Sequence, residues 1–313
     1  MSVELISLTP TQALGIPVAL LGAIFLAAGA QFQQHGVAKV DAATPNDKRS
    51  GLQIRQLLAL ARRPSWLIGT VLTGLSILLQ LFALYLAPLT IVQPLGALAL
   101  VITALINARI TKTRLTSGAI RAIIFCVVGV GIFVTVAALT TTTVPITDLQ
   151  LVIVVIILAV VLLLLGGTFV VLQARITRMF YVVGAGVLFG FVATLAKVLI
   201  TRVQTIIRAD FRISTADWLT IVCLLGLVAA GLLGTYFVQT AYASGSPEVV
   251  VAGLTVIDPI VGVTIGIAVL GEARSAPLWA GFAFAIAGIL AIYGVIQLSR
   301  RQAEAEARAD LRS

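Results

Sequence analysis

The sequence predicts an all-α polytopic membrane protein with about nine transmembrane helices, arranged as two inverted four-helix repeats joined by a linker helix. The chain is 60% hydrophobic and only 11% charged, whereas soluble domains carry about 25% charged residues. Apolar stretches of roughly 20 residues follow one another along the chain, and each could cross ~30 Å of hydrocarbon as a helix. A loose similarity between the first four and the last four stretches predicts the repeat.

The expected spans are 14–36, 65–87, 89–108, 118–138, 150–172, 179–201, 217–243, 247–271 and 277–298. No Lys or Arg precedes the first apolar run, so we expect a first membrane span there and no cleavable signal peptide. The seventh span is long, so it is either a tilted helix or conceals a short hairpin around Gly231–Gly234. The predicted units are a first repeat (1–138), a linker helix (139–178), a second repeat (179–298) and a charged cytoplasmic tail (299–313).

Basic residues gather in alternate connections. Most of the 21 Lys and Arg residues follow spans 1, 3 and 5 or lie in the C-terminal tail. The positive-inside rule then places the N-terminus outside and the C-terminus in the cytoplasm, in a cytoplasmic (inner) membrane. The net charge of +9 is therefore explained by topology, and we expect no nucleic-acid partner.

An Asp-Pro pair, Asp258-Pro259, sits near the middle of the eighth span. A carboxylate at that depth costs at least ~2.5–3.5 kcal/mol, so it should face the bundle interior or a wet cavity. Pro259 has no N–H for the carbonyl of Thr255, which predicts a kink. Either Asp258 belongs to a functional site, or it is a buried residue paired with a neighbour beside a packing kink.

The third span carries a matching pair, Gln93-Pro94, after an equally short connection. An odd linker helix turns the second copy upside down, and broken helices at matching positions mark the substrate site of secondary transporters. We therefore expect Gln93 and Asp258 to line the pseudo-twofold axis and bind substrate, while Pro94 and Pro259 permit gate bending. The alternative is interhelical hydrogen bonding worth ~0.6 kcal/mol.

Further polar residues within the spans complete the candidate substrate site: Gln80, Lys197, Tyr236, Gln239 and Tyr242. The last three follow helical spacing and are expected to form a stripe facing the cavity. Lys197 could snorkel to the outer headgroups, pair with Asp258, or bind an anionic substrate group. At the end of span 8, Glu272 and Arg274 are expected in the membrane interface.

Small residues in the fourth and ninth spans should let neighbouring helices approach closely. The glycines concerned are Gly129, Gly131, Gly281 and Gly288. The two cysteines lie within apolar spans and indicate neither a disulfide framework nor a metal site.

This arrangement resembles the drug/metabolite transporter superfamily. The segment LGE (Leu270–Glu272) is similar to the EamA-type pattern, in which a proline helix ends in a Gly-Glu turn. The segments APLTIVQPLGAL (Ala87–Leu98) and LLGAIFLAAGAQFQQHGV (Leu20–Val37), with the 4+1+4 span count, resemble NIPA-type magnesium transporters. The first repeat departs from the EamA pattern, because it closes with INARITKTRL and has no Gly-Glu turn. The first span also lacks the glutamate of the four-helix multidrug exporters, which argues against their proton-coupled mechanism.

Together these features predict a secondary transporter that moves a small metabolite by alternating access. The resemblance implies a NIPA-like magnesium transporter as an alternative, and a flippase of a lipid-linked sugar is another. Magnesium usually takes one or two carboxylates and keeps several waters, and Asp258 is the one carboxylate deep in a span. If transport is proton-coupled, Asp258 is the best-placed carrier.

Other classes fit less well. The chain has no GxxxxGK[ST] loop, so ATP drive is not expected. One histidine and one deep aspartate do not supply an enzyme site, so we expect neither catalysis nor a cofactor. A purely structural membrane protein remains an alternative. The expected partners are a small-molecule or ion substrate and the lipid bilayer, with a homodimer left open.

Overall fold

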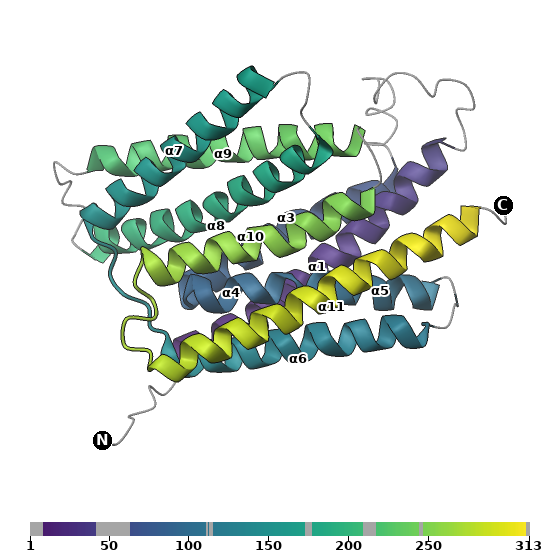
Figure 1. The fold of residues 1–313 in the computed structure, drawn as a ribbon, viewed down its shortest axis with the longest axis horizontal. Helices are drawn as coiled ribbons and strands as arrows, with labels where there is room; N and C mark the ends of the chain where they lie inside the picture. Colours follow the sequence, from purple (N-terminus) through teal and green to yellow (C-terminus); the bar gives the residue numbers. More distant parts are fainter. Residues whose placement is uncertain are drawn as a thin grey trace.

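The computed structural model describes residues 9–41, 63–110, 112, 115–172, 177–208, 217–243 and 247–310, and its elements in these ranges are helices (Figure 1). The helices are α1 (Pro10–Asp41), α3 (Pro64–Leu86), α4 (Leu89–Gly96), α5 (Leu98–Ile110), α6 (Ser117–Thr140), α7 (Asp148–Leu172), α8 (Arg178–Arg208), α9 (Asp217–Ala243), α10 (Pro247–Ala268) and α11 (Leu278–Asp310). Within the described residues, nine stretches are long and apolar enough to cross a membrane. The predicted fold class, an all-α multi-pass membrane protein, is confirmed.

The two proline-bearing spans differ. The third span is interrupted by a turn at Ala97, so it consists of α4 and α5. Pro94 explains the interruption, because it cannot donate to the carbonyl of Thr90 and disturbs the helix around it. By contrast, α10 is a single helix with Pro259 inside it. The third span is therefore interrupted shortly after its proline, whereas the eighth is continuous through Pro259.

The long seventh span is α9, which runs unbroken from Asp217 to Ala243. The alternative of a short hairpin at Gly231–Gly234 is wrong. An unbroken helix of 27 residues is about 40 Å long at 1.5 Å per residue, which is longer than the ~30 Å of hydrocarbon and is consistent with the alternative of a tilted span.

The helices pack in pairs that join distant parts of the chain. The α1 helix lies along α3, and α8 lies against both α9 and α10. Two further pairs connect the N-terminal half to the C-terminal half: α4 packs on α10, and α6 packs on α11. Figure 1 shows α6 and α11 running side by side along one edge of the bundle.

Glycines explain how close α6 and α11 come. A Cβ atom at Gly129 would overlap the backbone of Ala291, and one at Gly294 would overlap the backbone of Cys126. The prediction that small residues allow close helix approach is therefore confirmed for Gly129. It is wrong for Gly131, Gly281 and Gly288, since a Cβ atom there would meet nothing within 4 Å.

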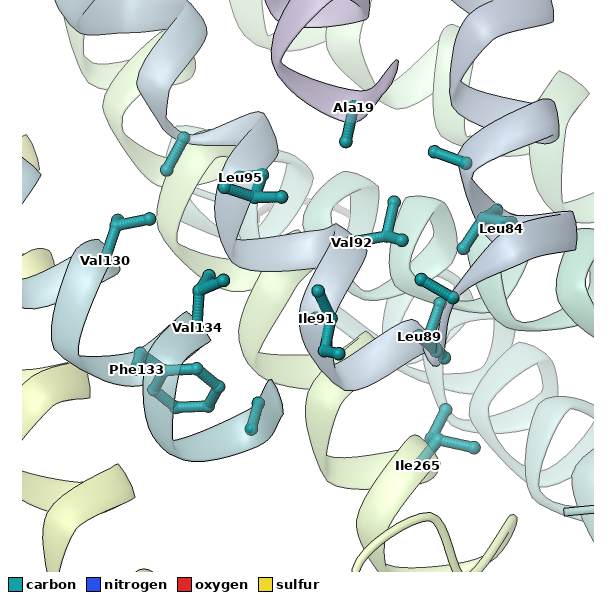
Figure 2. Packing of buried hydrophobic residues seen from close by; sticks show 14 of the residues in the cluster. Ala19, Leu84, Leu89, Ile91, Val92, Leu95, Val130, Phe133, Val134 and Ile265 are labelled. Atoms are coloured by element: carbon teal, nitrogen blue, oxygen red, sulfur yellow. The ribbon is translucent and has the colours of Figure 1, made fainter. Parts of the chain in front are cut away.

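The short helix α4 is the most enclosed element of the bundle. Each of its residues from Leu89 to Leu95 is buried. Figure 2 shows Ile91, Val92 and Leu95 surrounded by apolar side chains from neighbouring helices. These neighbours include Ala19 on α1, Leu84 on α3, Val130, Phe133 and Val134 on α6, and Ile265 on α10.

Three connections gather at one end of the bundle, on the left in Figure 1, where α1 also begins. They are the α3–α4, α6–α7 and α10–α11 connections, and hydrogen bonds join them. We call this the left end of the bundle. Glu272 and Gln150 lie at this end, and Gln93 lies about one helical turn further inside the bundle.

Candidate functional site

Gln93 and Asp258 meet where α4 packs against α10. The Nε2 atom of Gln93 donates a long hydrogen bond of 3.5 Å to Oδ1 of Asp258. Gln93 is buried and Asp258 is half-buried. A Cβ atom at Gly262 would lie 2.6 Å from Nε2 of Gln93, so this glycine makes room for the amide group. The two residues that were expected to line the pseudo-twofold axis lie in contact through an interhelical hydrogen bond.

The face of α10 beside this pair packs against α8. A Cβ atom at Gly186 or Gly190 would lie 2.6 Å from Cβ of Ile257 or Val261, respectively. Small residues on α8 therefore receive large residues of α10, which is the usual device for close helix packing in membranes. The contact fixes the rotation of α10 and directs Asp258 toward α4.

A cavity of about 420 Å³ lies between α10, α11, α6 and the α4–α5 turn. Pro94 and Pro259 both line it, together with apolar side chains such as Phe133 and Phe284. Its wall also includes Thr255, whose hydroxyl donates to the carbonyl of Val251 at 2.7 Å and so has a partner. The segments around Pro94 and Pro259 therefore both border this apolar cavity.

Glu272 caps the N-terminus of α4. Its side chain is buried and accepts hydrogen bonds from the amide of Leu89 (2.7 Å), the amide of Thr90 (2.8 Å) and the hydroxyl of Thr90 (2.5 Å). Amides in the first turn of a helix have no acceptor within the helix, and a negative charge there is favourable. Glu272 therefore turns inward to α4 and not outward to the lipid headgroups, whereas Arg274 is exposed.

Gly271 allows the turn that brings Glu272 to the N-terminus of α4. Its φ angle is +73°, a left-handed conformation that glycine adopts at little cost. The turn is closed by a bond of 3.0 Å from the amide of Glu272 to the carbonyl of Gly266. The amide of Thr142 donates to the carbonyl of Glu272 at 2.9 Å, which ties the α6–α7 connection to the same turn.

Gln150 on α7 holds the end of α10. Its Nε2 donates to the carbonyls of Val269 (3.0 Å) and Leu270 (3.1 Å). An ion pair of 3.0 Å between Asp148 and Arg202 joins α7 to α8 nearby. Sequence reasoning identified neither Gln150 nor the cap by Glu272, although the LGE segment was singled out and its Gly-Glu turn was the available signal.

Lys197 on α8 caps the other side of the α3–α4 break. Its side chain is buried, and Nζ donates to the carbonyls of Leu84 (2.6 Å) and Ala87 (2.8 Å). These carbonyls lie at the end of α3, where a positive charge is favourable. The interpretation of Lys197 as a residue that snorkels to the headgroups is wrong, and these bonds direct its ammonium group to α3 and not to Asp258.

The remaining predicted site residues lie elsewhere. Gln80 is half-buried on α3, one turn beyond Ser76, whose hydroxyl donates to the carbonyl of Gly22 on α1 at 2.8 Å. This places Gln80 on the side of α3 that packs against α1.

The predicted stripe on α9 is also remote from the Gln93–Asp258 pair. Tyr236 and Gln239 are exposed and share a helix face with the exposed side chains of Leu225 and Leu232. Phe237, the residue after Tyr236, points to α8 instead and packs on it at Gly184. The geometry therefore places Tyr236 and Gln239 on an outer face of aliphatic side chains. The side chain of Tyr242 lies outside the described residues.

The residues that the structure describes contain no group of three or more His, Cys, Asp or Glu side chains that could hold a metal ion. The contact between α4 and α10 at Gln93 joins one carboxylate, that of Asp258, to one amide group. The two helix caps, Lys197 and Glu272, lie beside it at the left end.

The fold defines the class as a multi-pass α-helical membrane protein. Residues 11–260 match the model of a family described as magnesium transporter NIPA, and the chain belongs to this family. It is also similar to a protein of Corynebacterium glutamicum described only as uncharacterized, with 27% identity over 261 residues, which cover 82% of this chain and 86% of that protein. No solved structure matches. Membership of a transporter family supports a transport function.

Proposed function

We propose that the protein is a secondary transporter of magnesium, and that Asp258 and Gln93 contact the ion between two inverted repeats. The observation that best supports this proposal is the Gln93–Asp258 contact, which joins two proline-bearing helices from the two halves of the chain. The family match supports magnesium as the cargo.

The chemistry of the pair suits a partly hydrated cation. Mg²⁺ dehydrates reluctantly and is commonly bound through one or two carboxylates with several retained waters. Asp258 supplies the carboxylate, and Gln93 carries an amide oxygen that can face a cation once its NH₂ group leaves Asp258. Pro94 and Pro259 each leave a backbone carbonyl without its helical donor, and such carbonyls coordinate ions in transporters.

Alternating access is the proposed mechanism of movement. The α1–α3 pair of the first half corresponds to the α8–α9 pair of the second, while α4–α10 and α6–α11 connect the halves. This pattern supports two repeats that rock against each other around the Gln93–Asp258 contact. The distribution of Lys and Arg residues supports an orientation with the left end outside the cell.

A small metabolite is the second candidate cargo, and the cavity favours it. Its walls are apolar and it borders both prolines, which suits an organic molecule with an apolar part better than a bare ion. In this case Asp258 and Gln93 would bind the polar end of the molecule.

The test is magnesium entry into proteoliposomes that contain a magnesium-sensitive dye. We expect uptake by the wild type and none by Asp258→Asn. The matched control is Asp148→Asn, the same substitution at a half-exposed side chain of the left end, and it should leave uptake intact. Size-exclusion chromatography and circular dichroism must show that all three proteins are folded.

Two results would count against the proposal in different ways. If folded wild type admits no magnesium, the cargo is wrong, and a metabolite-exchange screen follows. If Asp258→Asn transports like the wild type, the ion does not depend on this carboxylate and the site is wrong.

A further inference from the structure

We propose that Glu272 is a positioning residue for the transport site: by capping α4 it holds Gln93 against Asp258. This inference rests on the proposed function for its transport readout, because it deepens the account of the same site. Glu272 itself touches neither Gln93 nor Asp258 in the described contacts; its bonds go to Leu89 and Thr90.

The first argument is the accounting of backbone donors in α4. The first four amides of a helix need acceptors from outside the helix. In α4, Leu89 and Thr90 donate to the Glu272 carboxylate. Ile91 donates to the carbonyl of Pro88 at 3.1 Å, and Val92 makes the first regular helical bond to the same carbonyl at 3.2 Å. Because Pro88 at the N-cap has no N–H, Glu272 accepts from two of the three amides at the start of this buried helix that need an outside acceptor.

The second argument is the shortness of α4. The helix has eight residues, and Pro94 inside it removes one donor from its own hydrogen-bond ladder. Gln93 lies three residues after Thr90, one turn from the cap. A helix this short has little stability of its own, so the position of Gln93 depends on what holds Leu89 and Thr90.

The third argument is that the cap is itself held in place. Gly271 sets the turn, Thr142 binds the carbonyl of Glu272, and Gln150 binds the end of α10. On the other side of the break, Lys197 binds the last carbonyls of α3. Two residues from the C-terminal half of the chain therefore bind the two sides of the α3–α4 break. The negative charge of Glu272 lies at the start of α4, and the positive charge of Lys197 lies at the end of α3.

The experiment is a double-mutant cycle on the magnesium half-saturation constant in proteoliposomes. Glu272→Gln keeps the shape of the side chain but replaces one acceptor oxygen with a donor that faces backbone amides. We expect this variant to raise the half-saturation constant at least about tenfold, because hydrogen bonds to a buried charge are lost. In a Gln93→Ala background the same substitution should add almost nothing, since Glu272 acts through Gln93.

The control variant is Glu304→Gln. Glu304 is exposed on α11 and pairs with Arg301 at the surface at 3.3 Å, so this variant should transport like the wild type. A cap with a merely structural role would lower the yield of folded protein without changing the half-saturation constant. Equal effects of Glu272→Gln in the presence and absence of Gln93 would overturn the proposal.

A second readout does not depend on the cargo. In protein labelled with ¹⁵N-glutamine, the side-chain amide signal of Gln93 is the one missing from Gln93→Ala, and Asp258→Asn should move it. Glu272→Gln should move the same signal, identified by comparison with the double variant. An unchanged Gln93 signal would overturn the positioning role even if magnesium proves to be the wrong cargo.

Thr90→Val serves as a milder variant if Glu272→Gln does not fold. It removes one of the three hydrogen bonds to Glu272 and keeps both backbone amides in place. We expect a smaller shift of the half-saturation constant and of the Gln93 signal in the same direction. If neither changes in the folded variant, the proposal is wrong.

Discussion

Gln93 on α4 and Asp258 on α10 are 165 residues apart in the sequence, yet their side chains meet at 3.5 Å, and each residue directly precedes a proline. The contact joins the N-terminal and C-terminal halves of the chain inside the bundle. Gly262 allows it, because any side chain there would occupy the place of the Gln93 amide.

Magnesium should stabilise the wild-type protein through this contact. A ligand that binds only the folded state adds RT ln(1 + [L]/Kd), which is about 2.7 kcal/mol at 100 times Kd. We expect the melting temperature in detergent to rise with added Mg²⁺ and to fall back after treatment with a chelator. Asp258→Asn should show no such rise, whereas Asp148→Asn should respond like the wild type. A rise of equal size in Asp258→Asn would place the bound ion elsewhere.

Lys197 should contribute to stability through its charge and its two hydrogen bonds. Lys197→Met keeps much of the side-chain length but leaves the carbonyls of Leu84 and Ala87 without these donors. Hydrogen bonds to charged groups are worth ~1.5–3 kcal/mol, so thermal melting should occur at a clearly lower temperature. Lys197→Arg keeps the charge, so its melting temperature should lie between those of Lys197→Met and the wild type. A Lys197→Met protein as stable as the wild type would show that the cap is dispensable.

The nine spans could be predicted from the sequence because hydrocarbon thickness sets helix length directly. The Gln93–Asp258 contact was also within reach, since a repeated X-Pro pattern in two spans suggested equivalent positions. Both inferences depend on local composition or on a comparison of two short segments, which a single sequence contains.

The two caps could not be predicted in the same way. Lys197 binds carbonyls more than 100 residues away, and nothing in its own segment distinguishes that partner from lipid headgroups. Glu272 looked interfacial because it ends a span, and its burial follows from the turn at Gly271 and from the position of α4. The stripe on α9 failed for a related reason: helical spacing puts Tyr236 and Gln239 on one face but does not say which face is inside.

Gly271→Ala should disturb the site from a distance. Alanine in a left-handed conformation costs ~1–2 kcal/mol, and the φ angle of Gly271 is +73°. The turn that carries Glu272 would then relax, so we expect a lower melting temperature and a higher half-saturation constant for magnesium. Gly281→Ala is the control, because a Cβ atom at this helical position meets nothing within 4 Å. If Gly271→Ala has the half-saturation constant of the wild type, the turn at Gly271 does not influence the transport site.

The cavity beside Pro94 and Pro259 should matter for movement more than for folding. Gly288 lines this cavity, and a Cβ atom there would meet nothing within 4 Å. Gly288→Leu should therefore fold normally while filling space into which the proline segments move during the transport cycle. We expect the maximal uptake rate to fall severalfold with little change in the half-saturation constant.

Gly281→Leu is the matched control for the cavity. Gly281 lies on the same helix, also faces open space, and is not among the residues that line the cavity. Its substitution should leave both transport constants close to those of the wild type. The same comparison separates the two candidate cargoes, because an organic molecule held in the cavity would lose affinity in Gly288→Leu. A raised half-saturation constant with an unchanged maximal rate would therefore favour a binding role for the cavity over a role in gate movement.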